Sequence, residues 1–211
     1  MRIRQLRRVA AAAGIAAALV TTAAACASDG SDAASSGATT TTAATGNDQT
    51  ARPDDVNDAD IEFVQGMIPH HQQAIEMSEM VIDNGDDPDV IALAEQIEAA
   101  QGPEIDQMQT WLDDWGVEPD DMSDMSGMSG SDSMGDGMMS GDEMDAMSAM
   151  TGTDLDQMFL EMMIRHHDGA IEMAQVEIED GSNPDVVALA RTIIDTQQAE
   201  ISKMQSMTED T

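Results

Sequence analysis

The amino-acid sequence predicts an all-α protein, a four-helix bundle made of two repeated helical hairpins. One observation behind this is an internal repeat: FVQGMIPHHQQAIEM begins at Phe63 and FLEMMIRHHDGAIEM begins at Phe159, an ungapped offset of 96 residues (159 − 63). Another is that aromatic residues are only 2% of the chain. A core of Ile, Val, Leu, Met and Ala suits helices better than sheets. Because one hairpin cannot bury its apolar stripes alone, the two copies should pack together.

Each copy contains a turn with the same pattern, a glycine followed by an Asp-Pro or Asn-Pro pair. A glycine suits the left-handed position just past a helix end, and Asp or Asn before Pro caps the next helix. These residues are Gly85, Asp87 and Pro88 in the first copy, and Gly181, Asn183 and Pro184 in the second. We therefore expect helices over residues 57–84, 88–115, 154–180 and 184–207. Pro69 and Pro103 fall inside two of these helices and should bend them.

The domain consists of two hairpins, residues 57–115 and 154–211, joined by a crossover. The crossover, residues 116–153, is rich in Met, Asp, Ser and Gly and has no apolar stripe of helical period. Such a composition is typical of a flexible connection.

The first 25 residues indicate export, with an arginine-rich start, an alanine-rich apolar run and small residues before a cut site. The run is too short and too rich in alanine for a membrane span. Cys26, the only cysteine, follows three alanines and resembles a lipobox, in which the cysteine is lipidated and becomes the mature N-terminus. The protein would then be a cell-membrane lipoprotein, and residues 26–56 should form a disordered tether between the lipid anchor and the folded domain. The alternative is an ordinary signal peptide, an unmodified Cys26 and a periplasmic or secreted protein.

The chain is strongly acidic, with 42 Asp and Glu against 8 Lys and Arg and a formal net charge of −34. A surface of this charge repels nucleic acid and anionic membranes, so neither is an expected partner, and any membrane contact would pass through the lipid anchor. The same surface concentrates cations, although for most of these carboxylates solubility alone is a sufficient reason.

All four histidines lie in the two repeated pairs, His70-His71 and His166-His167. On a helical wheel, the second histidine of each pair lies in the middle of the apolar arc and the first lies at its edge. The edge position is shared with methionines seven residues further along. These methionines are Met77 and Met173, and Met162 joins them in the second copy.

The turn geometry brings polar residues of the second helix opposite each histidine pair. In an antiparallel hairpin, Gln101 and Glu104 reach the level of the first pair, and Gln197 and Glu200 reach the level of the second. Such partners orient metal-bound imidazoles. The alternative is a satisfied polar layer that only sets the register of the helices.

The abundant methionines, 20 in the chain, favour copper as the metal, because thioethers prefer Cu(I) and imidazole accepts both Cu(I) and Cu(II). The crossover contributes a cluster that we expect to bind metal as an auxiliary site. Its members are Met122, Met125, Met128, Met134, Met138 and Met139. The alternatives are compositional drift in the crossover and plain core packing for the helical methionines Met67, Met163, Met108 and Met204.

The two copies of F-x-x-x-M-x-x-H-H-x-x-A-I-E-M resemble the family known as domain of unknown function 305, which includes periplasmic copper-binding proteins of the CopM type. The resemblance covers residues 60–115 and 154–207. It implies a ferritin-like bundle that binds copper through His and Met and supports metal tolerance. The ligands it implies are Met67, His70, His71, Met77, Met163, His166, His167 and Met173. Gly66 stands where the second copy has Met162, so a first site with fewer thioethers is expected.

These observations together predict an exported copper-binding buffer or carrier without catalytic activity. The enzyme alternative is a ferritin-like di-metal oxidase, which requires Glu-x-x-His motifs. Three positions before the histidines stand Met and Ile instead: Met67, Ile68, Met163 and Ile164. A third alternative is a metal-free helical interaction module. The sequence does not identify a protein that donates or receives the metal.

Overall fold

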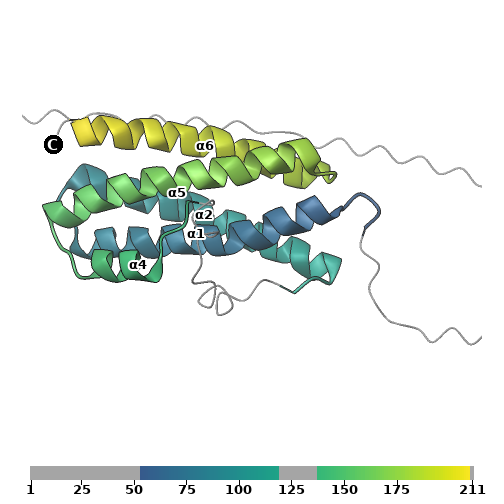
Figure 1. The fold of residues 1–211 in the computed structure, drawn as a ribbon, viewed down its shortest axis with the longest axis horizontal. Coiled ribbons are helices and arrows are strands. Elements are labelled where there is room, and N and C mark those ends of the chain that lie inside the picture. The colour runs from purple at the N-terminus through teal and green to yellow at the C-terminus, as the bar shows by residue number, and fades with distance from the viewer. Residues whose placement is uncertain (1–52, 119–136, 210–211) are drawn as a thin grey trace, which may run out of the picture. The chain divides into compact units, whose positions relative to one another are not determined.

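The computed structural model describes residues 53–118 and 137–209. The predicted signal peptide, Cys26, most of the tether and four crossover methionines (Met122, Met125, Met128 and Met134) lie outside these ranges. Within the described residues the protein is all-α and has no strand (Figure 1). The helices are α1 (Asp58–Asn84), α2 (Pro88–Trp115), α4 (Gly141–Ser148), α5 (Thr153–Asp180) and α6 (Pro184–Glu209). The four long helices confirm the predicted ranges to within two residues.

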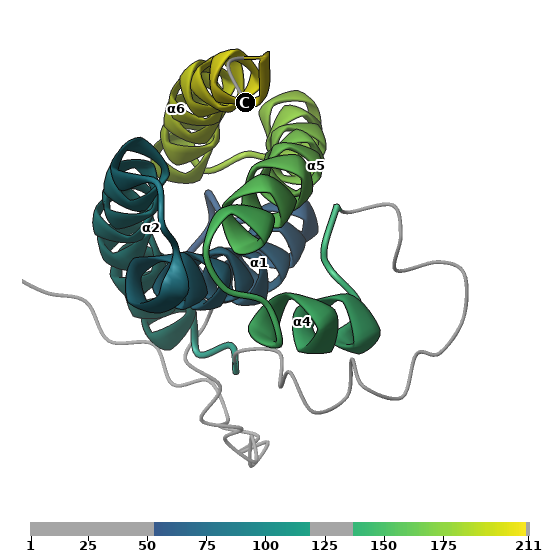
Figure 2. The same ribbon diagram turned by 90° about the vertical axis from the view of Figure 1, so that its left-hand side faces the viewer.

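The four long helices surround a common centre, and α4 lies outside them against α1 and α5 (Figure 2). The helices α1 and α2 form one hairpin, α5 and α6 form the other, and α1 packs directly on α5. The N-terminal half of α1 shares an apolar cluster with the C-terminal half of α5, so these two helices are antiparallel. The predicted bundle of two repeated hairpins is therefore confirmed.

The core consists of two apolar clusters at opposite ends of the bundle. Along α1 and α5, the histidines fall between the residues of one cluster and those of the other. One cluster contains Phe63, Val64 and Met67 of α1, and the other contains Ala74, Met77 and Val81. The same division occurs on α5, between Met163 in the second cluster and Ala170 in the first. Each cluster draws on all four long helices, so the two hairpins fold as one body.

The turn of each hairpin is held by an aspartate from the other hairpin. Asp60 of α1 accepts hydrogen bonds from the backbone N–H groups of Ser182 at 3.1 Å and Asn183 at 2.9 Å. At the repeat-related position of α5, Asp156 accepts from the N–H groups of Asp86 at 3.0 Å and Asp87 at 2.8 Å. Both aspartates are buried, so these charge-assisted bonds connect the two hairpins in a shielded environment.

The expectation of a left-handed glycine in each turn is wrong. Gly85 has φ −74° and Gly181 has φ −68°, values that any residue adopts. Glycine is required there because space is short: a Cβ on Gly85 would lie 2.5 Å from an Asp156 carboxylate oxygen and 2.7 Å from the Val81 carbonyl oxygen. The caps that follow the glycines are as predicted, with the Asp87 side chain accepting from Asp89 N at 2.8 Å.

Replacing Asp156 with alanine removes the acceptor of two backbone N–H groups, and we expect the free energy of unfolding to fall by about 2 kcal/mol. The control is Asp154→Ala, at an exposed position in the first turn of the same helix, which should cost less than about 1 kcal/mol. Urea unfolding of both variants measures the difference. Equal losses would contradict the role of Asp156 in joining the hairpins.

The crossover is more ordered at its C-terminal end than its composition predicts. Residues 137–140 lead into α4, whose first turn is capped by Ser140 and Glu143 in a capping box. Met139 is 5% exposed and Met147 is 0% exposed, and both join the second apolar cluster. At the end of the predicted tether, Val56 is also buried, at 5% exposure. These parts of the predicted loop and tether belong to the packed domain.

None of the helices in the described ranges has the length and apolar character that a membrane crossing requires.

Candidate metal centre

Four histidine side chains occupy the middle of the bundle. His70 and His71 come from α1, His166 and His167 come from α5, and all four are 0% exposed. The wheel placed the first histidine of each pair at the edge of the apolar arc, but that edge is the face on which α1 meets α5. Both histidines of each pair are therefore buried.

His70 and His166 are in contact across the two repeats, with ring centroids 3.8 Å apart and an angle of 43° between the ring planes. Among the described residues, neither ring nitrogen of His166 has a hydrogen-bond partner. Burial holds the pKa of His166 well below 6.5, and the nearby His70, His167 and His71 lower it further. His166 is therefore a neutral imidazole at neutral pH, with a nitrogen lone pair available to a metal ion.

The second histidine of each pair, His71 or His167, contacts a glutamate of the same hairpin. His71 Nε2 lies 2.8 Å from Glu104 Oε2, and His167 Nε2 lies 2.7 Å from Glu200 Oε2. The sequence predicted both glutamates at these levels. A carboxylate that accepts at Nε2 leaves the other ring nitrogen, Nδ1, as the donor of a lone pair. In the described part of the chain, Nδ1 of both rings lacks a hydrogen-bond partner.

Two buried glutamines complete this polar layer and leave it partly unsatisfied. Gln101 is 3% exposed and Gln197 is 2% exposed. Both amide heavy atoms of Gln101 and the side-chain oxygen of Gln197 lack partners among the described residues. Each unpaired buried polar atom costs about 1–3 kcal/mol. The layer is therefore not the fully satisfied network that a purely structural role in helix register would favour.

Methionines lie on both sides of the histidine pairs along α1 and α5. Met67, Met77 and Met163 are 0% exposed, Met162 is 6% exposed and Met173 is partly buried. A Cβ on Gly66 would lie 3.0 Å from the terminal methyl group of Met173. The first repeat lacks a thioether side chain at Gly66, and the side chain of Met173, from the other hairpin, fills the space beside this glycine.

The layer combines buried imidazoles with thioethers nearby on the same helices. Across residues 53–118 and 137–209, no three His, Cys, Asp or Glu side chains converge with the geometry of a metal site. An ion held by the described histidines would need sulfur ligands or a small movement of the rings. Both nitrogen and thioether donors suit copper, and the thioethers favour the softer Cu(I).

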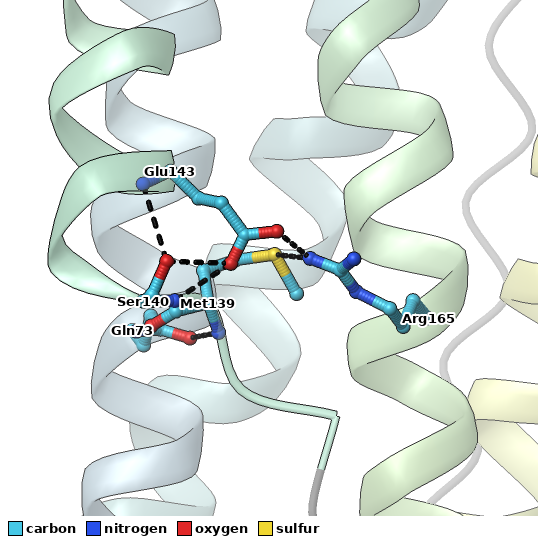
Figure 3. Close-up of polar contacts among 5 residues, drawn as sticks. All are labelled: Gln73, Met139, Ser140, Glu143 and Arg165. Atoms are coloured by element: carbon cyan, nitrogen blue, oxygen red, sulfur yellow. Dashed lines mark hydrogen bonds and ion pairs between the residues drawn. The ribbon is translucent and has the colours of Figure 1, made fainter. Parts of the chain in front are cut away.

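A second cluster, which the sequence did not reveal, lies on the outer side of the α1–α5 contact (Figure 3). Its members are Gln73, Met139, Ser140, Glu143 and Arg165. The Gln73 side chain forms two hydrogen bonds with the backbone of Met139, donating to its carbonyl at 2.9 Å and accepting from its N–H at 2.7 Å. Arg165 donates to the Met139 sulfur at 2.7 Å and forms an ion pair with Glu143. The available signal was a difference between the repeats, since Gln73 corresponds to Gly169 and Pro69 to Arg165.

The crossover methionines divide between the described and undescribed parts of the chain. Met139 is buried in the cluster of Figure 3 and Met138 is partly buried. The other four members of the predicted auxiliary site lie outside the described ranges, so their part of that site stays a prediction.

The fold and the buried layer define a class of protein: a four-helix bundle with imidazole and thioether groups at its centre. The chain belongs to the DUF305 family, the domain of unknown function 305, whose family model matches residues 60–208. A curated relative, the uncharacterized protein L153 of Acanthamoeba polyphaga mimivirus, is 40% identical over 55 residues. That alignment covers 26% of this chain and only 36% of the length of the relative.

Solved structures of related proteins share this fold. A DUF305 fragment from Deinococcus radiodurans is 30% identical, with a TM-score of 0.64, covering 74% of this chain and 99% of that one. A putative secreted DUF305 protein from Streptomyces coelicolor is 32% identical, with a TM-score of 0.64, covering 72% and 93%. CopM in its Cu(II)-bound form is 33% identical, with a TM-score of 0.61, covering 72% and 96%. CopM has also been solved in Cu(I)-bound and silver-bound forms.

Proposed function

We propose that this protein is an extracytoplasmic copper-binding protein that buffers or carries copper and performs no catalysis. The observation that carries the proposal is the layer of four fully buried imidazoles, several of whose nitrogens have no hydrogen-bond partner in the described chain, beside buried thioethers. Leaving such groups unpaired is costly unless a ligand uses them. The likeness to CopM, solved with Cu(I), Cu(II) and silver, supports copper as that ligand.

The proposed mechanism assigns separate tasks to different kinds of residue. The imidazoles donate nitrogen lone pairs, Glu104 and Glu200 fix the orientation of His71 and His167, and the thioethers favour Cu(I). Gln101 and Gln197 supply amide groups at the same level. The proposed ligand set is Met67, His70, His71, Met77, Met162, Met163, His166, His167 and Met173. The acidic surface raises the local concentration of the cation, and the crossover methionines capture it weakly.

Export is part of the same proposal. The N-terminal pattern of arginines, apolar residues and small residues supports it, and so does the description of the Streptomyces coelicolor neighbour as secreted. We propose that Cys26 carries a lipid anchor. Mass spectrometry of the protein purified from membranes tests this, since an unmodified Cys26 would indicate a periplasmic or secreted protein instead.

The central test is titration of the domain with Cu(I) and Cu(II), beside a variant in which His70, His71, His166 and His167 are all alanine. We expect the variant to lose the tight sites and to retain only weak binding by the crossover methionines. A chromophoric chelator in competition measures the affinity, and circular dichroism checks that the variant is helical. If the variant binds as tightly as the parent, the histidine layer is not the metal site.

A further inference from the structure

One methionine of the crossover, Met139, is bound to residues that neighbour the histidines in sequence, Gln73 on α1 and Arg165 on α5. Gln73 is 7% exposed, and its amide holds both backbone groups of Met139. Gln73 lies three residues after His70, on the same side of α1. These two hydrogen bonds therefore fix the backbone of Met139 to a point of α1 that is about one helical turn from His70.

The neighbouring residues fit the same place on α5. Gly137 has φ +72°, a conformation that favours glycine, and a Cβ there would lie 2.5 Å from the Arg165 carbonyl oxygen and 3.0 Å from Gly169 Cα. Gly137 thus lies directly on the turn of α5 that contains His166 and His167. The smallness of Gly169, where the first repeat has Gln73, permits this close approach.

Met139 is a buried member of the second apolar cluster, yet its sulfur accepts a hydrogen bond from an exposed arginine. Met139 is 5% exposed and belongs to the apolar cluster of Met77, Met162 and Met163. Arg165, whose side chain is 54% exposed, donates to the Met139 sulfur at 2.7 Å and also pairs with Glu143. A thioether is a weak acceptor, whereas a carboxylate is a strong one, so Arg165 can release the sulfur and keep its bond to Glu143.

We propose that Met139 is a further soft-metal ligand of the histidine layer, and that Arg165 occupies its sulfur until an ion arrives. The inference rests on the proposed copper function and adds a ligand and a means of control to it. In the exchange, the hydrogen bond from Arg165 to the sulfur breaks, the sulfur donates its lone pair to Cu(I), and Arg165 stays with Glu143. No electron is transferred, so Ag(I), which is not redox-active under these conditions, is a suitable second probe.

The test is a double-mutant cycle on the Cu(I) and Ag(I) affinities of the parent, Met139→Leu, Arg165→Gln and the double variant. We expect Met139→Leu to weaken Cu(I) binding by about tenfold or more, a loss typical of removing a group that supports a metal site. Arg165→Gln should tighten binding in the parent but not in the Met139→Leu background. The control is Met144→Leu on α4, another partly buried methionine, which should bind as the parent does.

Two results would overturn the inference. If Met139→Leu, shown by circular dichroism to be folded, binds Cu(I) as tightly as the parent, Met139 is not a ligand. If Arg165→Gln tightens binding equally in both backgrounds, Arg165 acts only through its charge and does not protect the sulfur. Either result leaves the copper function intact as long as the variant without histidines loses its tight sites. If that variant binds like the parent, the proposed function itself fails.

Discussion

The free energy of unfolding of the parent protein is expected to fall as the pH rises from 5 to 9, and replacing Glu177 with valine is expected to abolish this fall. Glu177 lies on α5, is 1% exposed, and stands where the first repeat has the buried Val81. Burial, and to a lesser extent the neighbouring Asp60 carboxylate, together raise the pKa of Glu177 from 4.5 to about 8. At neutral pH Glu177 is therefore protonated, near Asp60, which accepts hydrogen bonds from the turn between α5 and α6.

The sign of the effect follows from proton binding. Between pH 4.5 and about 8 the folded state keeps a proton on Glu177 that the unfolded state has lost. The contribution of this group is fully present below pH 4.5 and declines as the pH rises through 8. At 1.36 kcal/mol per pH unit, the total decline is on the order of 3–5 kcal/mol. In Glu177→Val and Glu177→Gln this decline should be absent.

Urea unfolding at pH 5 and pH 9 measures the effect in the parent and both variants. Glu177→Gln keeps the size and polarity of the side chain but cannot ionise, so it isolates the titration from packing. Glu177→Val restores the residue that the first repeat uses. If the parent and Glu177→Gln lose the same stability between the two pH values, Glu177 is not the group that titrates.

The helix limits were predictable because the same capping and turn residues occur in both copies of the repeat. Asp87 and Asn183 cap α2 and α6 as expected, and the Asn183 side chain accepts from Asp185 N at 3.0 Å. The match of Glu104 to the level of His71 followed from counting outward from the turn, which needs only the regular rise of two antiparallel helices. Local periodicity and one turn therefore determine these features.

Contacts between the hairpins were not predictable, because they depend on how two separately encoded units pack. The hydrogen bonds of Asp60 to residues 182 and 183, and the burial of His70, arise only when α1 meets α5. The clamp from Gln73 to Met139 joins residues 66 apart in the chain. The helix α4 did have a local signal, the Ser140-x-x-Glu143 capping box, but the surrounding Gly, Ser and Met residues masked its short apolar stripe.

Replacing His166 with leucine is expected to stabilise the metal-free protein while abolishing its response to copper. Leucine has a volume similar to that of histidine and removes two buried ring nitrogens that lack partners in the described chain. The gain should be about 1–3 kcal/mol. Functional sites commonly cost stability in this way. Copper added to the parent should raise its melting temperature, because a ligand of the folded state stabilises it, and this rise should disappear in His166→Leu.

The matched variant is His167→Leu, one residue further along α5. This change leaves the Glu200 carboxylate, whose side chain is 14% exposed, without the imidazole that it binds, so stability should fall by about 1–2 kcal/mol. The two variants also differ in acid. Because the pKa of His166 is lowered in the folded state, the parent loses stability as the pH falls below 6.5, and His166→Leu should lose less.

Thermal unfolding of the parent and the two variants, with and without copper, measures both predictions, and a pH series from 7.5 to about 5 measures the third. Opposite changes in stability would show that the two adjacent histidines have different roles: His166 lacks a hydrogen-bond partner in the metal-free protein, whereas His167 is already held by Glu200. Equal destabilisation by both changes would mean that His166 contributes packing that leucine cannot replace. A copper-dependent rise that persists in His166→Leu would place the metal away from the contact between His70 and His166.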